Sequence, residues 1–230
     1  MNGIEINDEL FNSAARAEYE IAMREIASDG YPYSLGETRK RLDKITADVL
    51  ERSPEALACG PGCWYCCFYK VDARANEVFR IVEYVRSHFK PEAAKSLREK
   101  IDHNAKIMRG LSHQEKLAAN LQCPFLQDGR CSIYPVRPEK CRTFHAKDVE
   151  GCKKAYEEPD NLTIPNSYIT DLYSAMNGHC DGFKMAMHQS GYDVAVYELN
   201  MALAASMRDA KPRKRFERKK RAFSAAMSDE

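Results

Sequence analysis

Four cysteines fall within nine residues of this chain, in the sequence CGPGCWYCC, at Cys59, Cys63, Cys66 and Cys67. Four more follow at Cys123, Cys131, Cys141 and Cys152, and the ninth is Cys180. The N-terminal sequence MNGIEINDELFNSAARAEYE is polar and acidic, and it lacks the apolar stretch of a secretory signal peptide. We therefore expect a cytoplasmic location. In that reducing environment so many thiols serve a metal ion, an iron–sulfur cluster or redox chemistry rather than disulfides.

The spacing within the first motif supports a metal site. Cys63-x-x-Cys66 lets two thiolates converge on one ion. Gly60, Pro61 and Gly62 favour a tight turn just before this pair. Cys66 and Cys67 are adjacent, and the side chains of adjacent residues diverge. Either the two thiols serve different centres, or one is a ligand and the other packs beside it; we favour two centres.

The second half of the cysteine pattern is CPFLQDGRCSIYPVRPEKCRTFHAKDVEGC. Its cysteines are too widely spaced for a zinc-finger knuckle and suit loops that wrap a centre, with Asp128-Gly129 as a hairpin turn. The two halves provide enough thiols for two four-cysteine sites, or for one cluster and one zinc ion. The candidate metal ligands are Cys59, Cys63, Cys66, Cys67, Cys123, Cys131, Cys141 and Cys152. The alternative, a buried thiol that only packs as a small apolar group, suits Cys180 best.

These motifs resemble the CxxCxxCC family, the YkgJ-type zinc- or iron-chelating domains. The resemblance covers roughly residues 57–152. It depends on the first cysteine motif and on Cys123, Pro124, Phe125, Leu126, Cys131, Ile133, Tyr134, Arg137, Pro138, Cys141, Arg142 and Phe144. Three residues separate Cys59 from Cys63 where the family name implies two, and the flexible Gly-Pro-Gly sequence can absorb this difference. The resemblance implies metal chelation. Flagellin lysine-N-methylases have a similar cysteine pattern, so it also permits a cluster-dependent enzyme.

The rest of the sequence predicts a mainly α protein, in which helices clamp an irregular, metal-stapled cysteine-rich loop region. Hydrophobic periodicity and capping signals predict helices at 8–28, 34–52, 74–89, 91–108, 112–120, 166–188 and 191–209. Short strand-like pieces occur near 68–72 and 131–134. We expect one helical domain at 1–210, with the cysteine region at 57–152 and a helical insertion at 74–120.

Charge is uneven along the chain. The net charge is +1, but residues 211–230 contain eight Lys and Arg against three acids. We expect this segment to be a basic, disordered tail, with weak nucleic-acid contact at most. No apolar run reaches the roughly 18 residues of a membrane helix, so no membrane partner is expected.

For other residues near the cysteines, the sequence allows more than one role. Arg137 and Arg142 flank Cys141 and could offset thiolate charge, bind a substrate anion, or cap backbone carbonyls. His145 could complete a three-cysteine, one-histidine site. Trp64 and Tyr65 are expected to shield the centre from water.

Two functions are consistent with these features. The first is a metal-binding protein that holds zinc or an iron–sulfur cluster in a structural or metal- and redox-handling role. The alternative is a cluster-dependent enzyme that resembles flagellin lysine-N-methylases and transfers methyl groups to protein lysines. No catalytic residue is assigned, because no known hydrolase, P-loop or haem motif is present. Thiolates suit both zinc and iron, so the sequence leaves the metal open.

Overall fold

The computed structural model describes residues 5–224 and 227 and is mainly helical, as the sequence predicts. The chain divides into two compact units. Unit 1 contains Met1–Cys59, Thr143–Val149 and Pro165–Val194. Unit 2 contains Gly60–Arg142, Glu150–Ile164 and Ala195–Glu230. None of the described helices is long and apolar enough to cross a membrane.

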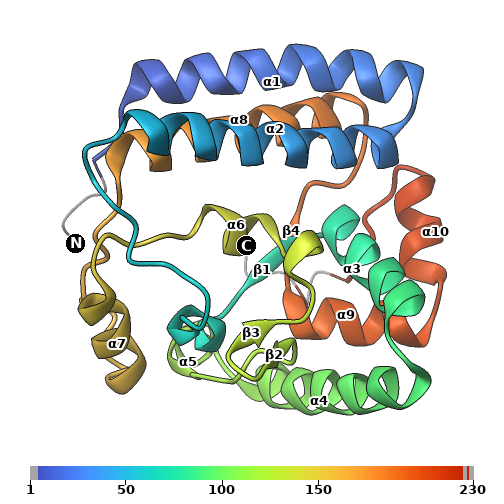
Figure 1. Ribbon diagram of the computed structural model, residues 1–230. Coiled ribbons are helices and arrows are strands. Elements are labelled where there is room, and N and C mark those ends of the chain that lie inside the picture. Colours follow the sequence, from blue (N-terminus) through green and yellow to red (C-terminus); the bar gives the residue numbers. More distant parts are fainter. Residues whose placement is uncertain (1–4, 225–226, 228–230) are drawn as a thin grey trace. The chain divides into compact units, whose positions relative to one another are not determined.

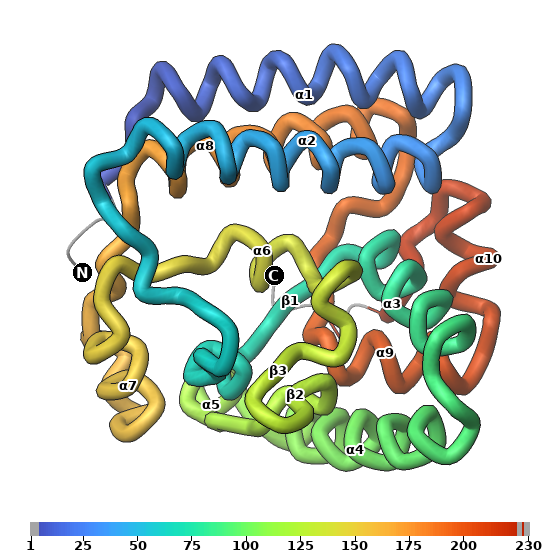
Figure 2. The backbone as a smooth tube through the Cα atoms, viewed as in Figure 1, coloured from blue at the N-terminus to red at the C-terminus, as the bar shows by residue number. Residues whose placement is uncertain are grey.

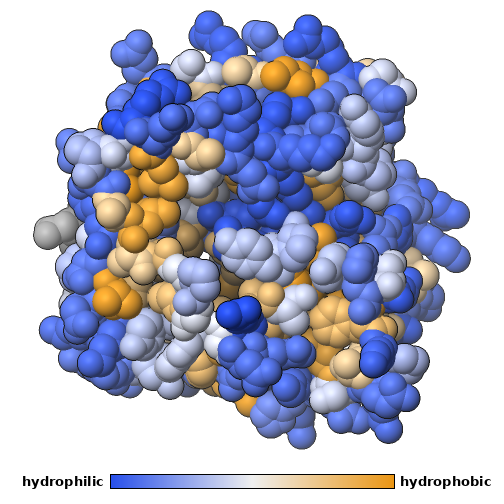
Figure 3. All heavy atoms as spheres, viewed as in Figure 1, coloured by the Kyte–Doolittle hydropathy of each residue, from blue (hydrophilic) through white to orange (hydrophobic). Residues whose placement is uncertain are grey.

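Unit 1 is built on three long helices that lie side by side, α1 (Asp8–Ser28), α2 (Tyr31–Arg52) and α8 (Thr170–Gln189) (Figure 1). Asn7 caps α1, because its side chain accepts a hydrogen bond from the Leu10 N–H. Helix α2 begins at Tyr31 rather than at Ser34, since Gly30 (φ +82°) ends the preceding turn and Pro32 fits a first helical turn. The surface along α1 and α2 in Figure 3 is mostly hydrophilic, which leaves the apolar stripes to the interior.

Two glycines let α8 approach the backbone of α1 closely. A Cβ added to Gly178 would lie 2.2 Å from the Phe11 carbonyl oxygen, and one added to Gly182 would lie 2.2 Å from that of Ala15. Any side chain at either position would therefore collide with main-chain atoms. The spacing of four residues places both glycines on one face of α8, so the contact between α1 and α8 depends on them.

A buried ion-pair network also joins the helices of unit 1. Arg41 on α2 donates to both oxygens of Glu18, at 2.6 and 2.7 Å, and to Glu25 at 2.7 Å. The Glu18 side chain is only 1% exposed, so this pairing compensates a charge that burial would otherwise make costly. His179 on α8 lies 3.4 Å from the same carboxylate.

Four helices of unit 2 and the two-stranded sheet β1–β4 lie outside its cysteine-rich part and its C-terminal segment (Figure 2). The helices are α3 (Ala75–His88), α4 (Pro91–Gly110), α5 (His113–Ala118) and α9 (Leu199–Arg208). Strand β1 (Asp72–Arg74) pairs antiparallel with β4 (Val196–Glu198), with Ala73 opposite Tyr197. Helix α9 packs against both α3 and α4. The buried Glu198 caps α9 by accepting the Asn200 and Met201 N–H groups.

The cysteine-rich part of unit 2 contains only short elements. They are η1 (Tyr65–Phe68), β2 (Leu126–Gln127), β3 (Arg130–Cys131), η2 (Tyr134–Val136), α6 (Glu139–Thr143) and α7 (Val149–Glu157). The predicted hairpin turn is present, because Asp128 (φ +49°) and Gly129 (φ +72°) connect β2 to β3 in left-handed conformations. Such short elements bury little apolar surface by themselves, so this region needs other stabilising interactions.

The sequence predicts a disordered tail at 211–230, of which residues 225–226 and 228–230 lie outside the described part of the chain; the described part contains a helix and buried aromatic rings. Residues Lys211–Glu217 form helix α10, which packs on α3 and α9. Phe216 is fully buried and lies edge-on to Phe79, with ring centroids 5.5 Å apart. Phe223 is 2% exposed and lies 4.8 Å from the Tyr197 ring. These two aromatic anchors order the segment through contacts that are distant in sequence, which a local charge pattern does not reveal.

Candidate metal centre

Main-chain contacts in unit 2 bring the two halves of the cysteine pattern together. The Cys123 N–H donates to the Cys67 carbonyl at 2.7 Å. A Cβ added to Gly129, at the tip of the β2–β3 hairpin, would lie 3.9 Å from both the Gly62 carbonyl oxygen and the Trp64 ring. The first motif and the hairpin are therefore neighbours, although helices α3, α4 and α5 separate them in sequence.

The first motif folds as a tight turn followed by a 3-10 helix. The Cys63 N–H donates to the Gly60 carbonyl at 3.1 Å, and Gly62 has a φ of +91° that favours glycine. Cys66 and Cys67 lie on η1, where the Cys67 N–H donates to the Trp64 carbonyl at 2.8 Å. This local structure confirms the turn predicted from the Gly-Pro-Gly sequence.

The β2–β3 hairpin positions Cys123 and Cys131. Cys131 lies opposite Leu126 in the ladder, and the Leu126 N–H donates to the Cys123 carbonyl at 3.0 Å. The Ser132 N–H then donates to the Phe125 carbonyl at 2.8 Å, while the Phe125 side chain is buried. The apolar residues between these cysteines therefore anchor the hairpin and hold its two thiols at one end.

Cys141 is positioned by helix α6, and Glu77 holds the start of that helix. One carboxylate oxygen of Glu77 accepts the Glu139 N–H at 2.6 Å, and the other accepts the Arg74 N–H at 2.9 Å. Arg74 in turn donates to Glu139 at 2.7 Å. A single buried carboxylate thus caps both α3 and α6. Glu77 is not among the predicted site residues, and its only signal in the sequence is its place three residues after Arg74, the pattern of a capping box.

Four thiols from these segments interact electrostatically. Burial, with smaller contributions from the charges of Cys131 and Cys66, raises the pKa of Cys123 to about 12. Burial also raises the pKa of Cys131 and, to a greater extent, that of Cys141, where Cys123, Cys66 and Cys131 add to the shift. A hydrogen bond between the Cys66 and Cys67 side chains is the largest cause of the raised pKa of Cys66. Negative charge on any of these thiols is therefore unfavourable without a nearby cation.

Arg137 supplies one such positive charge. It lowers the pKa values of Cys66, Cys131 and Cys141, against the dominant effects that raise them. Its guanidinium lies over the Tyr134 ring, 4.0 Å from the centroid. Its Nε is buried and has no hydrogen-bond partner in the structure. A buried donor beside several thiols fits an anionic metal–thiolate centre, whose sulfur atoms accept hydrogen bonds.

The thiols are not gathered tightly around one point. In residues 5–224 and 227, no three Cys, His, Asp or Glu side chains are arranged closely enough to enclose a metal ion. The chemistry of the donor set nevertheless fits zinc or iron. Repulsion among neighbouring thiolates disfavours their ionised form, and a thiophilic cation offsets that repulsion.

An aromatic cluster lies directly beside the first motif. Trp64 contacts Tyr65, Phe68 and Tyr156, with ring centroids 4.8, 5.5 and 5.1 Å apart. Tyr156 comes from α7, and its carbonyl accepts a hydrogen bond from Asn120. From the sequence, Trp64 and Tyr65 are expected to shield the centre from water. The rings are half-buried and packed together, an arrangement consistent with that expectation.

The remaining predicted ligands are in varied surroundings. Cys63 is half-buried, Cys152 is buried on α7 and its carbonyl accepts a hydrogen bond from the Tyr69 hydroxyl, and Cys59 is exposed in unit 1. Cys180, predicted to be a packing residue, lies in an apolar cluster of unit 1 with Leu42 and Met176.

His145 and Arg142 have structural partners. The Ile169 N–H donates to His145 Nε2 at 3.1 Å, so Nδ1 carries the proton and donates to the Thr143 carbonyl at 3.0 Å. Burial lowers the pKa of this ring. Arg142 donates to the Pro135 carbonyl at 2.6 Å. Both nitrogens of His145 are thus occupied by the backbone of unit 1, which argues against the three-cysteine, one-histidine site.

A comparison with protein families identifies the cysteine region. The model of the CxxCxxCC family, described as a "putative zinc- or iron-chelating domain", matches residues 58–181, which is more than half of the chain. No curated protein and no solved structure matches the chain. The match confirms the expected family and the expected zinc- or iron-chelating character. The chain belongs to the CxxCxxCC family of zinc- or iron-chelating domains.

Proposed function

We propose that this protein holds zinc or iron through a four-thiolate centre formed by Cys66, Cys123, Cys131 and Cys141. The observation that carries the proposal is the hydrogen bond from the Cys123 N–H to the Cys67 carbonyl, which places η1, with Cys66, beside the hairpin that holds Cys123 and Cys131. The electrostatic interaction of Cys141, on α6, with Cys66, Cys123 and Cys131 supports the same grouping. Cys59, Cys63, Cys67 and Cys152 remain predicted ligands of a second centre or of a larger cluster.

The role that the fold supports best is structural stabilisation of the cysteine-rich part of unit 2. The segments that carry the four thiols are a 3-10 turn, two-residue strands and a five-residue helix. A structural zinc site contributes about 10–16 kcal/mol in small domains, which is comparable with the stability of a whole domain. A metal that links these segments would fix their relative positions far more strongly than their few backbone hydrogen bonds.

Arg137 would act beside the ligands rather than as one of them. Four thiolates around a divalent zinc ion leave a net charge of −2, and a guanidinium next to them reduces this charge. The buried Nε offers a hydrogen bond to a ligand sulfur, which would fix the position of that sulfur. Glu77 would contribute indirectly by holding α6, and with it Cys141.

The enzymatic alternative, methyl transfer to protein lysine by a cluster with an open coordination position, has less support. It needs polar groups directed toward that position, and the polar residues near the cysteines are Tyr134, Arg137, Arg142 and His145. Arg142 and His145 are engaged by backbone groups, and Arg137 stacks on Tyr134. A shallow cleft of about 460 Å³ reaches Cys123 and is lined by Lys100 and His103, among other residues. This cleft is one place where a small substrate could reach Cys123.

Anaerobic purification followed by elemental analysis and a visible spectrum tests the proposal. Colourless protein with stoichiometric zinc supports a closed zinc site. Brown protein with iron and acid-labile sulfide supports an iron–sulfur cluster on the same thiols. Protein that carries neither metal, and that binds neither when it is reduced and reconstituted, contradicts the proposal.

A further inference from the structure

The C-terminal segment presents a dense group of cations on an ordered backbone. Between residues 211 and 221 there are eight Lys and Arg and a single acid, Glu217. Arg213 pairs with both Glu83 and Glu217. Lys211 also pairs with Asp209, at 3.3 Å. The side chains other than Arg213 are all exposed: Lys211, Lys214, Arg215, Arg218, Lys219, Lys220 and Arg221. We call these seven residues the basic surface.

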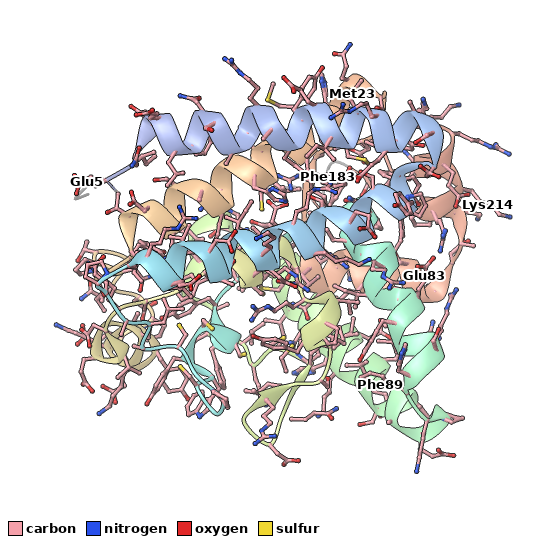
Figure 4. The ribbon with its side chains drawn as sticks, turned by 45° about the horizontal axis from the view of Figure 1, so that its top comes forward. Glu5, Met23, Glu83, Phe89, Phe183 and Lys214 are labelled. Atoms are coloured by element: carbon pink, nitrogen blue, oxygen red, sulfur yellow. The ribbon has the colours of Figure 1, made fainter. Side chains whose placement is uncertain are left out.

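Buried contacts with α3 and β4 fix the backbone that carries the basic surface. Phe216 and Phe223 are buried against Phe79 and Tyr197, and Arg213 binds Glu83 on α3. Figure 4 shows Lys214 at the outer edge of α10, whereas Glu83 belongs to α3. A cation on a fixed backbone loses less conformational entropy on binding than one on a disordered tail, so this ordering favours a binding role.

The backbone conformation of Lys219 is a second observation that favours a binding role for the basic surface. It follows the end of α10 with a φ of +57°, and the hydrogen bonds from Lys219 to Phe216 and from Lys220 to Arg215 form a Schellman motif. Glycine is the usual residue at this left-handed position, because a side chain there is strained. A lysine at a position where glycine would be more stable suggests that its positive charge serves a function.

We propose that the basic surface binds the phosphate backbone of nucleic acid without sequence preference. Helix α10 is about 10 Å long, and duplex DNA carries one charge per about 1.7 Å of its axis, so several phosphates face the surface at once. The two phenylalanines of this segment are buried, which leaves neither of them to stack on bases. For the same reason neither can insert into a lipid surface, so nucleic acid fits better than a membrane.

The test is the binding of a labelled, mixed-sequence DNA duplex, measured by fluorescence anisotropy at several salt concentrations with the full chain. We expect salt-sensitive binding. The triple variant Lys214→Gln/Arg215→Gln/Arg218→Gln should bind at least about 10-fold more weakly and lower the log–log salt slope by about 2–3. The matched control Arg24→Gln/Lys40→Gln/Lys44→Gln removes the same charge from α1 and α2 and should bind as the parent does.

The variant Lys219→Gly separates stability from binding. It should raise the melting temperature, because glycine relieves the left-handed strain, and it should weaken DNA binding. Absence of binding at low salt, unchanged affinity of the triple variant, or equal weakening by the control overturns the proposal. Equal or tighter salt-sensitive binding to a polyglutamate peptide or to anionic phospholipid vesicles also overturns it.

Discussion

The backbone amide of Cys123 donates a hydrogen bond of 2.7 Å to the carbonyl of Cys67. This bond joins the two cysteine motifs of unit 2 across the long helical insertion formed by α3, α4 and α5. Backbone contacts therefore already bring the two motifs together. A metal ion would then have to draw in only the thiols, which lowers the conformational cost of forming the site.

Replacement of Arg137 should weaken metal binding without unfolding the protein. Arg137→Gln removes the charge that favours the thiolate forms of Cys66, Cys131 and Cys141. We expect metal affinity to fall by about 10–100-fold in a competition titration with a chelator, the range typical for partners of metal ligands. Lys140→Gln, at an exposed position on α6, is the control for the loss of one charge. Equal affinities of the two variants would show that Arg137 does not support the centre.

Replacement of Gly178 should destabilise the packing of α8 on α1. In Gly178→Ala the new methyl group would meet the Phe11 carbonyl oxygen at 2.2 Å, so the helices must separate. We expect a loss of about 1–3 kcal/mol in the free energy of unfolding, measured in urea. Gly36→Ala on α2 is the matched control, because its Cβ meets nothing within 4 Å. It should stabilise the protein by about 0.5–1 kcal/mol. The opposite order of stabilities would refute the close-approach interpretation.

Replacement of Phe216 tests whether the C-terminal segment is part of the fold. Phe216 is fully buried and contacts Phe79, so Phe216→Ala should cost about 3–5 kcal/mol of stability. Hydrogen exchange should also become faster in residues 211–223. Lys220→Ala, at an exposed position of the same segment, should stay within about 0.5 kcal/mol of the parent. A neutral Phe216→Ala variant would support the disordered tail expected from the sequence.

The buried ring of His145 predicts a loss of stability in acid. Burial lowers its pKa in the folded state below the value of about 6.5 for an exposed histidine. The unfolded chain therefore binds the proton more readily, and stability falls as the pH drops below about 6.5. Nitrogen chemical shifts of the ring should report a neutral Nδ1–H form that titrates below this value. A His145 that titrates above 6.5, or that carries its proton on Nε2, would be inconsistent with the hydrogen bonds to Thr143 and Ile169.

Local sequence signals predicted much of the fold. The limits of α1 follow from the Asn7 cap and from Asp29-Gly30, and the hairpin follows from Asp128-Gly129. Helices α6 and α7 were missed because they are short and lie where proline and cysteine obscure the helical period. Strand β4 lies within the predicted helix at 191–209. Three residues are too few to show the alternation of apolar and polar side chains typical of a strand, and the partner strand β1 is distant in sequence.

The cysteine pattern predicted the chemistry better than the geometry. It identified the thiols and the family, but not which thiols interact, because that depends on where the hairpin and α6 lie in space. The role of Glu77 could not be predicted for the same reason, since its hydrogen bond from the Glu139 N–H joins two elements that are distant in sequence. The ordered C-terminal segment depends on the contact between Phe79 and Phe216, which no local pattern indicates.

The most direct test of the proposed centre is the metal content of single cysteine variants purified without oxygen. We expect Cys66→Ser and Cys141→Ser to lose stoichiometric zinc or iron and to melt at a lower temperature. Cys180→Ala removes a thiol from the apolar cluster of unit 1 and should retain the full metal content of the parent. If Cys66→Ser and Cys141→Ser bind as much metal as the parent, with the same affinity in a chelator competition, the four-thiolate centre is wrong.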